Sequence, residues 1–196
     1  MSEYPDLTPE ESAEYNKITS RMKEISNEID EGGYTFYSNW IAAQNAAFAY
    51  LPNGSYKAYA MELENLRDMY TAEFNKLYDV YFADGEGDVA VFSNNCITLL
   101  TNIENMNVPE ELKASHDEVI NAISAERDAH QAVLTINQLY DEHPGAAFED
   151  LPPDSQEQIM ECDEILNNFF SEDNTEYYAL DEALNAALES ADTLAG

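Results

Sequence analysis

The chain has 196 residues, of which 44% are hydrophobic, so it is long enough to bury one substantial core without disulfides or metals. Its 40 acidic residues against eight basic ones give a formal net charge of −32, which argues against direct binding to nucleic acid or to an anionic membrane. Thirteen Tyr, eight Phe and regularly spaced Leu and Ile argue against a disordered chain.

The negative charge is unevenly distributed along the chain. Residues 1–127 carry 23 acids and 8 bases, whereas residues 128–196 carry 17 acids and no base, because Arg127 is the last one. This excess goes beyond what solubility requires, and it costs self-repulsion in the folded state. We therefore expect one domain over 1–196 in which the acidic end has a function, with 146–196 as a candidate acidic subdomain.

Helical periodicity dominates the first half of the chain. Thr8-Pro9-Glu10-Glu11 has the pattern of a capping box and predicts the start of a first helix, which Gly32-Gly33 ends. An aromatic and alanine-rich second helix is predicted over 34–51. A third, capped by Ser55 and running to about Tyr81, has apolar residues at steps of three and four along one face.

Four further helices are predicted after the glycine-containing loop at 84–88. A helix over 92–106 is followed by the longest one, from about 107 to 140, and then by helices over 154–170 and 175–194. No segment has the alternation of a strand. The predicted fold is all-α, an antiparallel bundle of six to seven helices with one long central helix.

The residues that most often carry chemistry do not form a known motif. Each of the three histidines lacks a Glu three positions earlier, so the Glu-x-x-His pair of di-metal bundles is missing. For His116 and His130, a satisfied or half-exposed bundle histidine is favoured over a metal ligand. A calcium-binding hand that starts at Asp84 needs Gly at its sixth position and Glu at its twelfth, where this chain has Val89 and Asn95. The 84–88 loop is therefore interpreted as a turn. We therefore expect no catalytic residue, metal or cofactor, and a chain that is not an enzyme.

Two cysteines, Cys96 and Cys162, lie far apart in the sequence. Each falls on the apolar face of its predicted helix and neither is part of a Cys-x-x-Cys motif. Buried free thiols are favoured over a disulfide, which weakly indicates a reducing compartment.

The most regular acidic pattern lies in the helix predicted over 154–170. Ile159, Cys162 and Leu166 define its inward face, and acids at steps of three and four define the outward one. Acids at this spacing are about 5–6 Å apart, comparable to successive phosphates of a nucleic-acid strand. We call this row the acidic stripe: Asp154, Glu157, Glu161 and Glu164.

Further candidates continue from the stripe toward the C-terminus. The last helix repeats the acidic pattern less regularly, and Phe169, Phe170, Tyr177 and Tyr178 flank the hinge between the two helices as either core residues or exposed anchors. The full set of candidate partner-binding residues is Asp154, Glu157, Glu161, Glu164, Glu172, Asp173, Glu176, Tyr178, Asp181, Glu189 and Asp192.

In composition, size and helical pattern, the chain resembles the DNA-mimic inhibitors of phages and other mobile elements, including anti-restriction and some anti-CRISPR proteins. This is a functional class rather than a sequence family. The resemblance implies a basic, nucleic-acid-binding protein as partner, inhibition by an acidic surface, and a location in the host cytoplasm.

A second resemblance points to a different function. The segment 108–123 is similar to one that recurs in helical-bundle proteins and lipoproteins of Gram-positive bacteria, which implies a structural or cell-surface bundle with no nucleic-acid-related role. The N-terminal residues lack the basic and apolar regions of a secretory signal, which favours a cytoplasmic protein without a membrane span. An adaptor for a basic partner without mimicry, and a homodimer along the long third and fifth helices, stay open.

Overall fold

A computed structural model describes residues 8–9, 11–13, 15–20, 43–44, 46–51, 53–82, 87–170 and 176–196. All regular secondary structure in these ranges is helical, which confirms the predicted fold class. The main elements are α3 (Gly54–Phe82), α4 (Val89–Glu104), α5 (Lys113–Glu142), α6 (Pro153–Phe169) and α7 (Glu176–Ala195), with short 3-10 turns η2 (Glu110–Leu112) and η3 (Phe148–Asp150).

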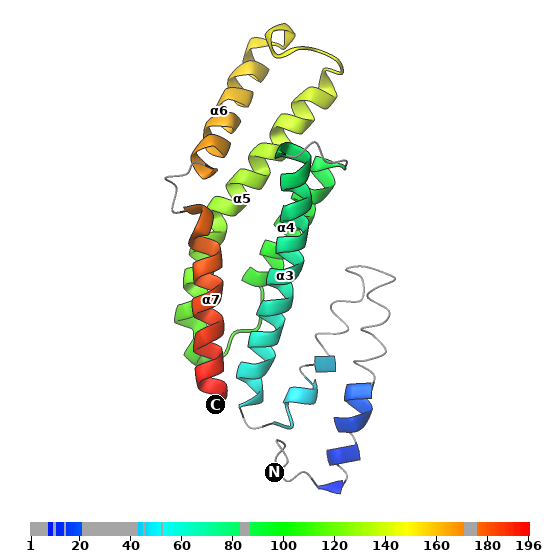
Figure 1. The fold of residues 1–196 in the computed structure, drawn as a ribbon, viewed down its shortest axis with the longest axis vertical. Helices are drawn as coiled ribbons and strands as arrows, with labels where there is room; N and C mark the ends of the chain where they lie inside the picture. The colour runs from blue at the N-terminus through cyan, green and yellow to red at the C-terminus, as the bar shows by residue number, and fades with distance from the viewer. Residues whose placement is uncertain are drawn as a thin grey trace.

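Four helices form an antiparallel bundle, in which α3, α4, α5 and α7 each contact two of the others (Figure 1). The remaining long helix, α6, comes after α5 in the chain, runs antiparallel to it and packs mainly against its C-terminal part. In Figure 1, α6 lies above α7, so the two helices together run along the length of α5. The long central helix predicted from the sequence is α5, with 30 residues.

The main core fills the space between these four helices, because apolar residues recur at steps of three and four on each of them. On α7 the small side chains of Ala187 and Ala191 are fully buried and let this helix approach its neighbours closely. The largest buried side chains of this core are Tyr59, Leu63, Leu66, Leu99, Leu100, Ile103, Leu112, Ile123 and Leu184.

A smaller apolar cluster joins α6 to the end of α5. Leu139 of α5, Leu151 of the connecting segment and Ile159 of α6 are buried together, with Phe148 packed against them. The hairpin of α5 and α6 therefore has its own small core, separate from the core of the four-helix bundle.

Several helix starts follow the local signals in the sequence. The capping box is confirmed, because Thr8 N donates to Glu11 Oε2 at 2.8 Å and Glu11 N to Thr8 Oγ1 at 3.3 Å. Asp88 caps α4 by accepting hydrogen bonds from Ala90 N and Val91 N. That role agrees with the turn predicted for the 84–88 loop, whose residues 84–86 lie outside the described ranges.

The start of α3 differs by two residues from the prediction. The helix begins at Gly54 rather than after Ser55, and a Cβ at position 54 would lie 1.8 Å from the carbonyl oxygen of Phe48. Only glycine fits this close approach of two backbone segments.

Both cysteines are buried free thiols, as predicted. Burial is the main cause that raises the pKa of Cys96 to about 12, with the nearby carboxylates Glu73 and Glu126 adding to it. The Cys96 thiol is therefore protonated and unreactive at neutral pH.

Two of the three histidines lie inside the bundle and bond to tyrosines of α3. His116 Nδ1 is 3.0 Å from the hydroxyl of Tyr59, and His130 Nε2 is 3.1 Å from the hydroxyl of Tyr70. Burial lowers the pKa of both imidazoles, that of His130 to about 4. Both are bundle histidines with one hydrogen bond to a tyrosine, as predicted, but His116 is not fully satisfied because its Nε2 is buried with no hydrogen-bond partner among the described residues.

Candidate functional site

The acidic stripe lies on a helix whose start is held from two sides. Pro153 occupies the first position of α6 and Asp154 lies in the first turn, where a carboxylate interacts favourably with the helix dipole. The Gln156 amide donates to the carbonyl of Leu151 at 2.8 Å and to that of Glu149 at 3.3 Å. These bonds tie the first turn of α6 to the segment that precedes it.

All four carboxylates of the stripe are exposed on the outward face of α6. At 3.6 residues per turn, their positions fall within a sector of about 80° around the helix axis. The opposite face is anchored on α5, with Ile159, Cys162 and Phe169 buried and Leu166 half-buried. The amphipathic pattern expected for this helix is therefore confirmed, and it holds the four acids in one fixed row.

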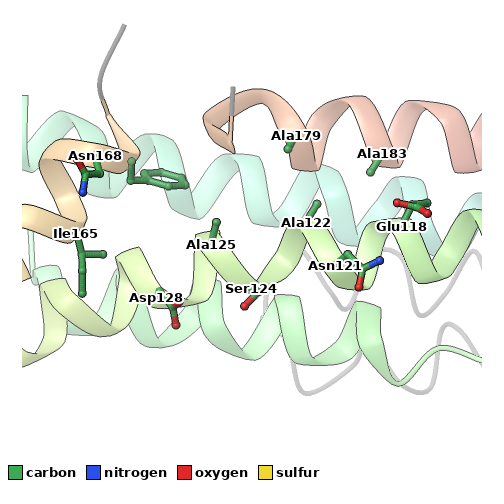
Figure 2. A pocket seen from close by; sticks show the side chains of 11 residues that line it. Glu118, Asn121, Ala122, Ser124, Ala125, Asp128, Ile165, Asn168, Ala179 and Ala183 are labelled. Atoms are coloured by element: carbon green, nitrogen blue, oxygen red, sulfur yellow. The ribbon is translucent and has the colours of Figure 1, made fainter. Parts of the chain in front are cut away.

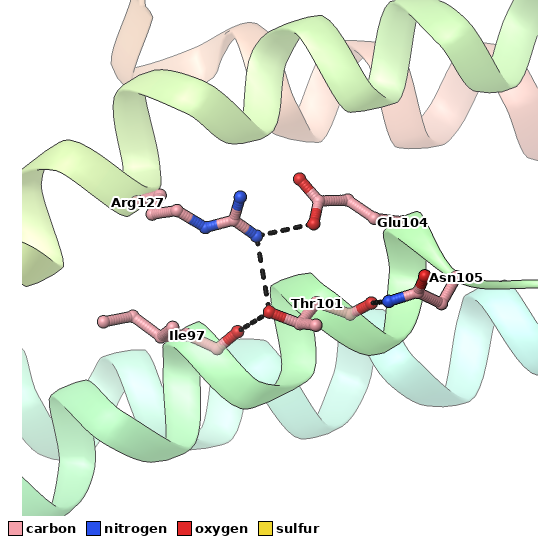
Figure 3. A network of polar contacts seen from close by, with 5 residues as sticks. All are labelled: Ile97, Thr101, Glu104, Asn105 and Arg127. Carbon is pink, nitrogen blue, oxygen red and sulfur yellow. Dashed lines mark hydrogen bonds and ion pairs between the residues drawn. The ribbon is translucent and has the colours of Figure 1, made fainter.

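No basic side chain contacts the stripe within the described part of the chain. The nearest Arg in sequence, Arg127, turns to α4 instead, where it donates to Glu104 at 2.7 Å and to Thr101 Oγ1 at 3.4 Å (Figure 3). The bond to Glu104 is the main cause that raises the pKa of Arg127. Arg127, the last Lys or Arg in the chain, therefore forms an ion pair between α5 and α4 and does not neutralise the stripe.

Two apolar side chains are exposed on α6 beside the acids, and sequence reasoning missed both. Met160, 56% exposed, follows Glu157 by one turn and precedes Glu164 by one turn. Ile165, 41% exposed, lies at the other edge of the stripe. Their position next to inward residues was the available signal, because 160 and 165 fall about 100° from Ile159 and Leu166 on a helix.

On α7, the acids Asp181, Glu189 and Asp192 are exposed. Asp181 is partly compensated, because Asn185 Nδ2 donates to its Oδ2 at 3.1 Å while Asn185 Oδ1 accepts from Arg67 of α3 at 3.0 Å. The acidic face of α7 therefore has a link to a base, which the stripe on α6 does not have among the described residues.

The aromatic residues near the α6–α7 connection divide between core and surface. Phe169 is buried and packs edge-to-face on half-buried Phe170, with ring centroids 5.0 Å apart. Tyr178 is 60% exposed. The side chain of Tyr177 lies outside the description, as do Glu172, Asp173 and the side chain of Glu176.

A shallow cleft of about 610 Å³ lies where α6 and α7 meet across α5 (Figure 2). Ala122 and Ala125 of α5 and Ala179 and Ala183 of α7 contribute small apolar side chains to its walls. The polar and larger lining residues include Glu118, Asn121, Ser124, Asp128, Ile165 and Asn168. Ile165 thus joins the edge of the acidic stripe to an apolar surface that carries two more carboxylates.

The described residues contain no group of three or more His, Cys, Asp or Glu side chains arranged to hold a metal ion. Among the same residues, no helix combines the length and apolar character needed to cross a lipid bilayer. Comparison with protein-family models, with curated proteins and with solved structures gave no match to this chain.

Proposed function

We propose that this chain is a non-enzymatic, acidic binding protein that inhibits a nucleic-acid-binding protein by occupying its basic groove. The observation that carries the proposal is the acidic stripe: four exposed carboxylates in one row, with no basic side chain in contact among the described residues. A helix face that only needs to be soluble can carry both acidic and basic residues, so solubility alone does not explain a row of acids.

The geometry of α6 supports recognition of a surface that binds phosphates. Carboxylates one helical turn apart repeat at about 5–6 Å, and the buried face of α6 keeps them in register. A basic groove that binds a nucleic-acid strand presents Lys and Arg side chains at a similar repeat. Because the helix backbone is already formed, binding orders only the side chains of the row and not a disordered segment.

The exposed apolar residues supply contacts that charge alone would not. Met160 and Ile165 flank the stripe and can pack on the aliphatic stems of Lys and Arg of the partner, whose charged ends reach the carboxylates. Tyr178, exposed on α7, is a further candidate anchor. This arrangement fits a protein partner better than a simple counter-ion.

A competition experiment tests the proposal. Labelled duplex DNA is bound to a restriction endonuclease, to an RNA-guided nuclease complex and to a sequence-specific DNA-binding protein, and this chain is added as competitor. We expect displacement of DNA from at least one of them, with an affinity of this chain for the partner that falls as salt rises from about 50 to 200 mM, because salt screens exposed charge pairs. Absence of displacement at low salt from every basic groove tested would favour a structural bundle instead.

A further inference from the structure

A second cleft, unrelated to α6, reaches a buried carboxylate. It measures about 280 Å³ and lies between α3 and α7, with Glu126 of α5 among its lining residues. Glu126 is only 5% exposed, yet it is one of the residues that line the cleft. A carboxylate in this position is reached through the cleft and is otherwise surrounded by the bundle.

Only one oxygen of this carboxylate is engaged. Tyr70 donates its hydroxyl proton to Glu126 Oε2 at 2.5 Å, and His130 Nε2 must then donate to the Tyr70 oxygen at 3.1 Å, because Tyr70 has one proton to give. No described residue donates a hydrogen bond to the second oxygen, Oε1. Oε1 is not among the described buried atoms that lack a partner, so it is reached from the cleft, and a ligand in the cleft can donate a hydrogen bond to it.

The walls of the cleft suit a cation that has an apolar body. Tyr70, Phe74 and Tyr178 contribute aromatic rings, whose faces attract cations. At the rim, Arg67 and Asp181 carry opposite charges and are linked through Asn185. The charge left over in the cleft is therefore that of Glu126.

We propose that this cleft binds a small primary amine in its protonated form, with the ammonium group donating to Glu126 Oε1 and the apolar body packed against Phe74 and Tyr178. The ammonium supplies both the positive charge and the hydrogen-bond donor that the second oxygen lacks. This site lies on α3, α5 and α7, and it goes beyond the inhibitory function proposed for α6.

Binding to this site depends on the ionisation of Glu126. Burial raises its pKa to about 7, against a smaller lowering by the Tyr70 hydrogen bond. Of the neighbouring groups, buried His130 is neutral and Cys96 of α4 is a protonated thiol in this pH range. Glu73, the other buried acid of α3, is paired with Lys76 and accepts from Asn95.

The probe is 2-phenylethylamine, titrated into the full chain by calorimetry at pH 8 and pH 6, with the neutral 2-phenylethanol as a comparison ligand. We expect saturable binding of the amine at one site and at least tenfold weaker binding of the alcohol. Because the ionised fraction of Glu126 falls from about nine-tenths to about one-tenth over this range, amine affinity should fall about tenfold at pH 6. Equal affinity at the two pH values, or equal binding of the alcohol, would overturn the proposal.

Two variants and one control variant locate the site. Glu126→Gln keeps the shape and an acceptor for Tyr70, and it should lose at least tenfold in amine affinity at pH 8 together with the pH dependence. Glu182→Gln removes the same charge from an exposed position of α7 that does not line the cleft and should bind like the parent. Tyr178→Ala, at a 60% exposed position, should weaken binding severalfold without lowering the melting temperature, so it decides the matter even if Glu126→Gln fails to fold. Unchanged binding by Tyr178→Ala, or by a folded Glu126→Gln, would contradict the assignment.

Discussion

The hydroxyl of Tyr70 bonds to two buried groups, Glu126 and His130, whose pKa values are shifted in opposite directions. Burial raises the pKa of Glu126 from 4.5 to about 7 and lowers that of His130 from 6.5 to about 4. The raised carboxyl contributes stability that is present below pH 4.5 and lost as pH rises through 7. The depressed imidazole contributes stability that is present above pH 6.5 and lost as pH falls through 4. In the parent protein the two effects largely cancel between pH 4.5 and 6.5.

Glu126→Gln should expose this balance. Because Gln does not titrate, the variant should be about as stable as the parent near pH 4.5 and more stable at pH 8 by up to about 3 kcal/mol, at about 1.36 kcal/mol per pKa unit. Urea unfolding of both proteins across this range measures the difference. A difference in unfolding free energy that does not grow with pH would show that Glu126 titrates normally in the folded state.

At the scale of helices, α6 differs from the other described helices in its packing. α3, α4, α5 and α7 each contact two neighbours of the bundle, whereas α6 packs mainly on the end of α5 through the small cluster around Ile159. A helix held by one neighbour opens at a lower free energy than the bundle that it joins.

Ile159→Ala should therefore loosen α6 selectively. Loss of the buried side chain costs about 2–5 kcal/mol, which exceeds what one small cluster can spare. Amide hydrogen exchange should accelerate over Pro153–Phe169 while the amides of α3 and α4 keep their protection. Leu99→Ala, in the main core, serves as the comparison and should accelerate exchange throughout the bundle. Uniform acceleration by Ile159→Ala would mean that α6 unfolds only with the whole protein.

Helix positions were largely predictable from the sequence, because apolar spacing and caps are local signals. The Thr8 capping box, the break before α4 and the inward face of α6 all follow from residues within one or two turns. The close approach of Gly54 to the carbonyl of Phe48 was missed, since it is a packing contact that local helix signals do not show. The Tyr70–Glu126–His130 cluster was missed for the same reason, as it joins residues 56 and 60 positions apart. For the candidate interface, the acids could be identified in the sequence. The exposure of Met160 and Ile165 also depends on the rotation of α6 about its own axis relative to α5.

For the whole molecule, the dominant property is a net charge of −32 on 196 residues. No base follows Arg127, and that side chain is bonded to Glu104 of α4. The C-terminal third therefore repels itself through solvent, where added salt screens the interaction.

Salt should consequently stabilise the free protein. Raising ionic strength from about 0.05 to 0.5 M should raise unfolding free energy by about 1 kcal/mol or more, a shift of about 2–4 °C in melting temperature for a chain of this size. Sodium chloride and tetramethylammonium chloride should act alike if screening is the cause. A melting temperature that stays constant or falls with both salts would show that self-repulsion does not limit stability.

The same screening acts in the opposite direction on a complex, which makes charge reversal on α6 the most direct test of the proposed inhibitory surface. The measurement is the affinity of a triple variant, Glu157→Lys, Glu161→Lys and Glu164→Lys, for the nucleic-acid-binding protein that the parent displaces from DNA. A matched variant, Glu64→Lys, Asp68→Lys and Asp79→Lys, makes the same change in net charge at exposed positions of α3. We predict that the α6 variant loses inhibition with its helicity intact while the α3 variant retains most of it. Inhibition that survives reversal on α6, or is lost equally in both variants, would contradict the account.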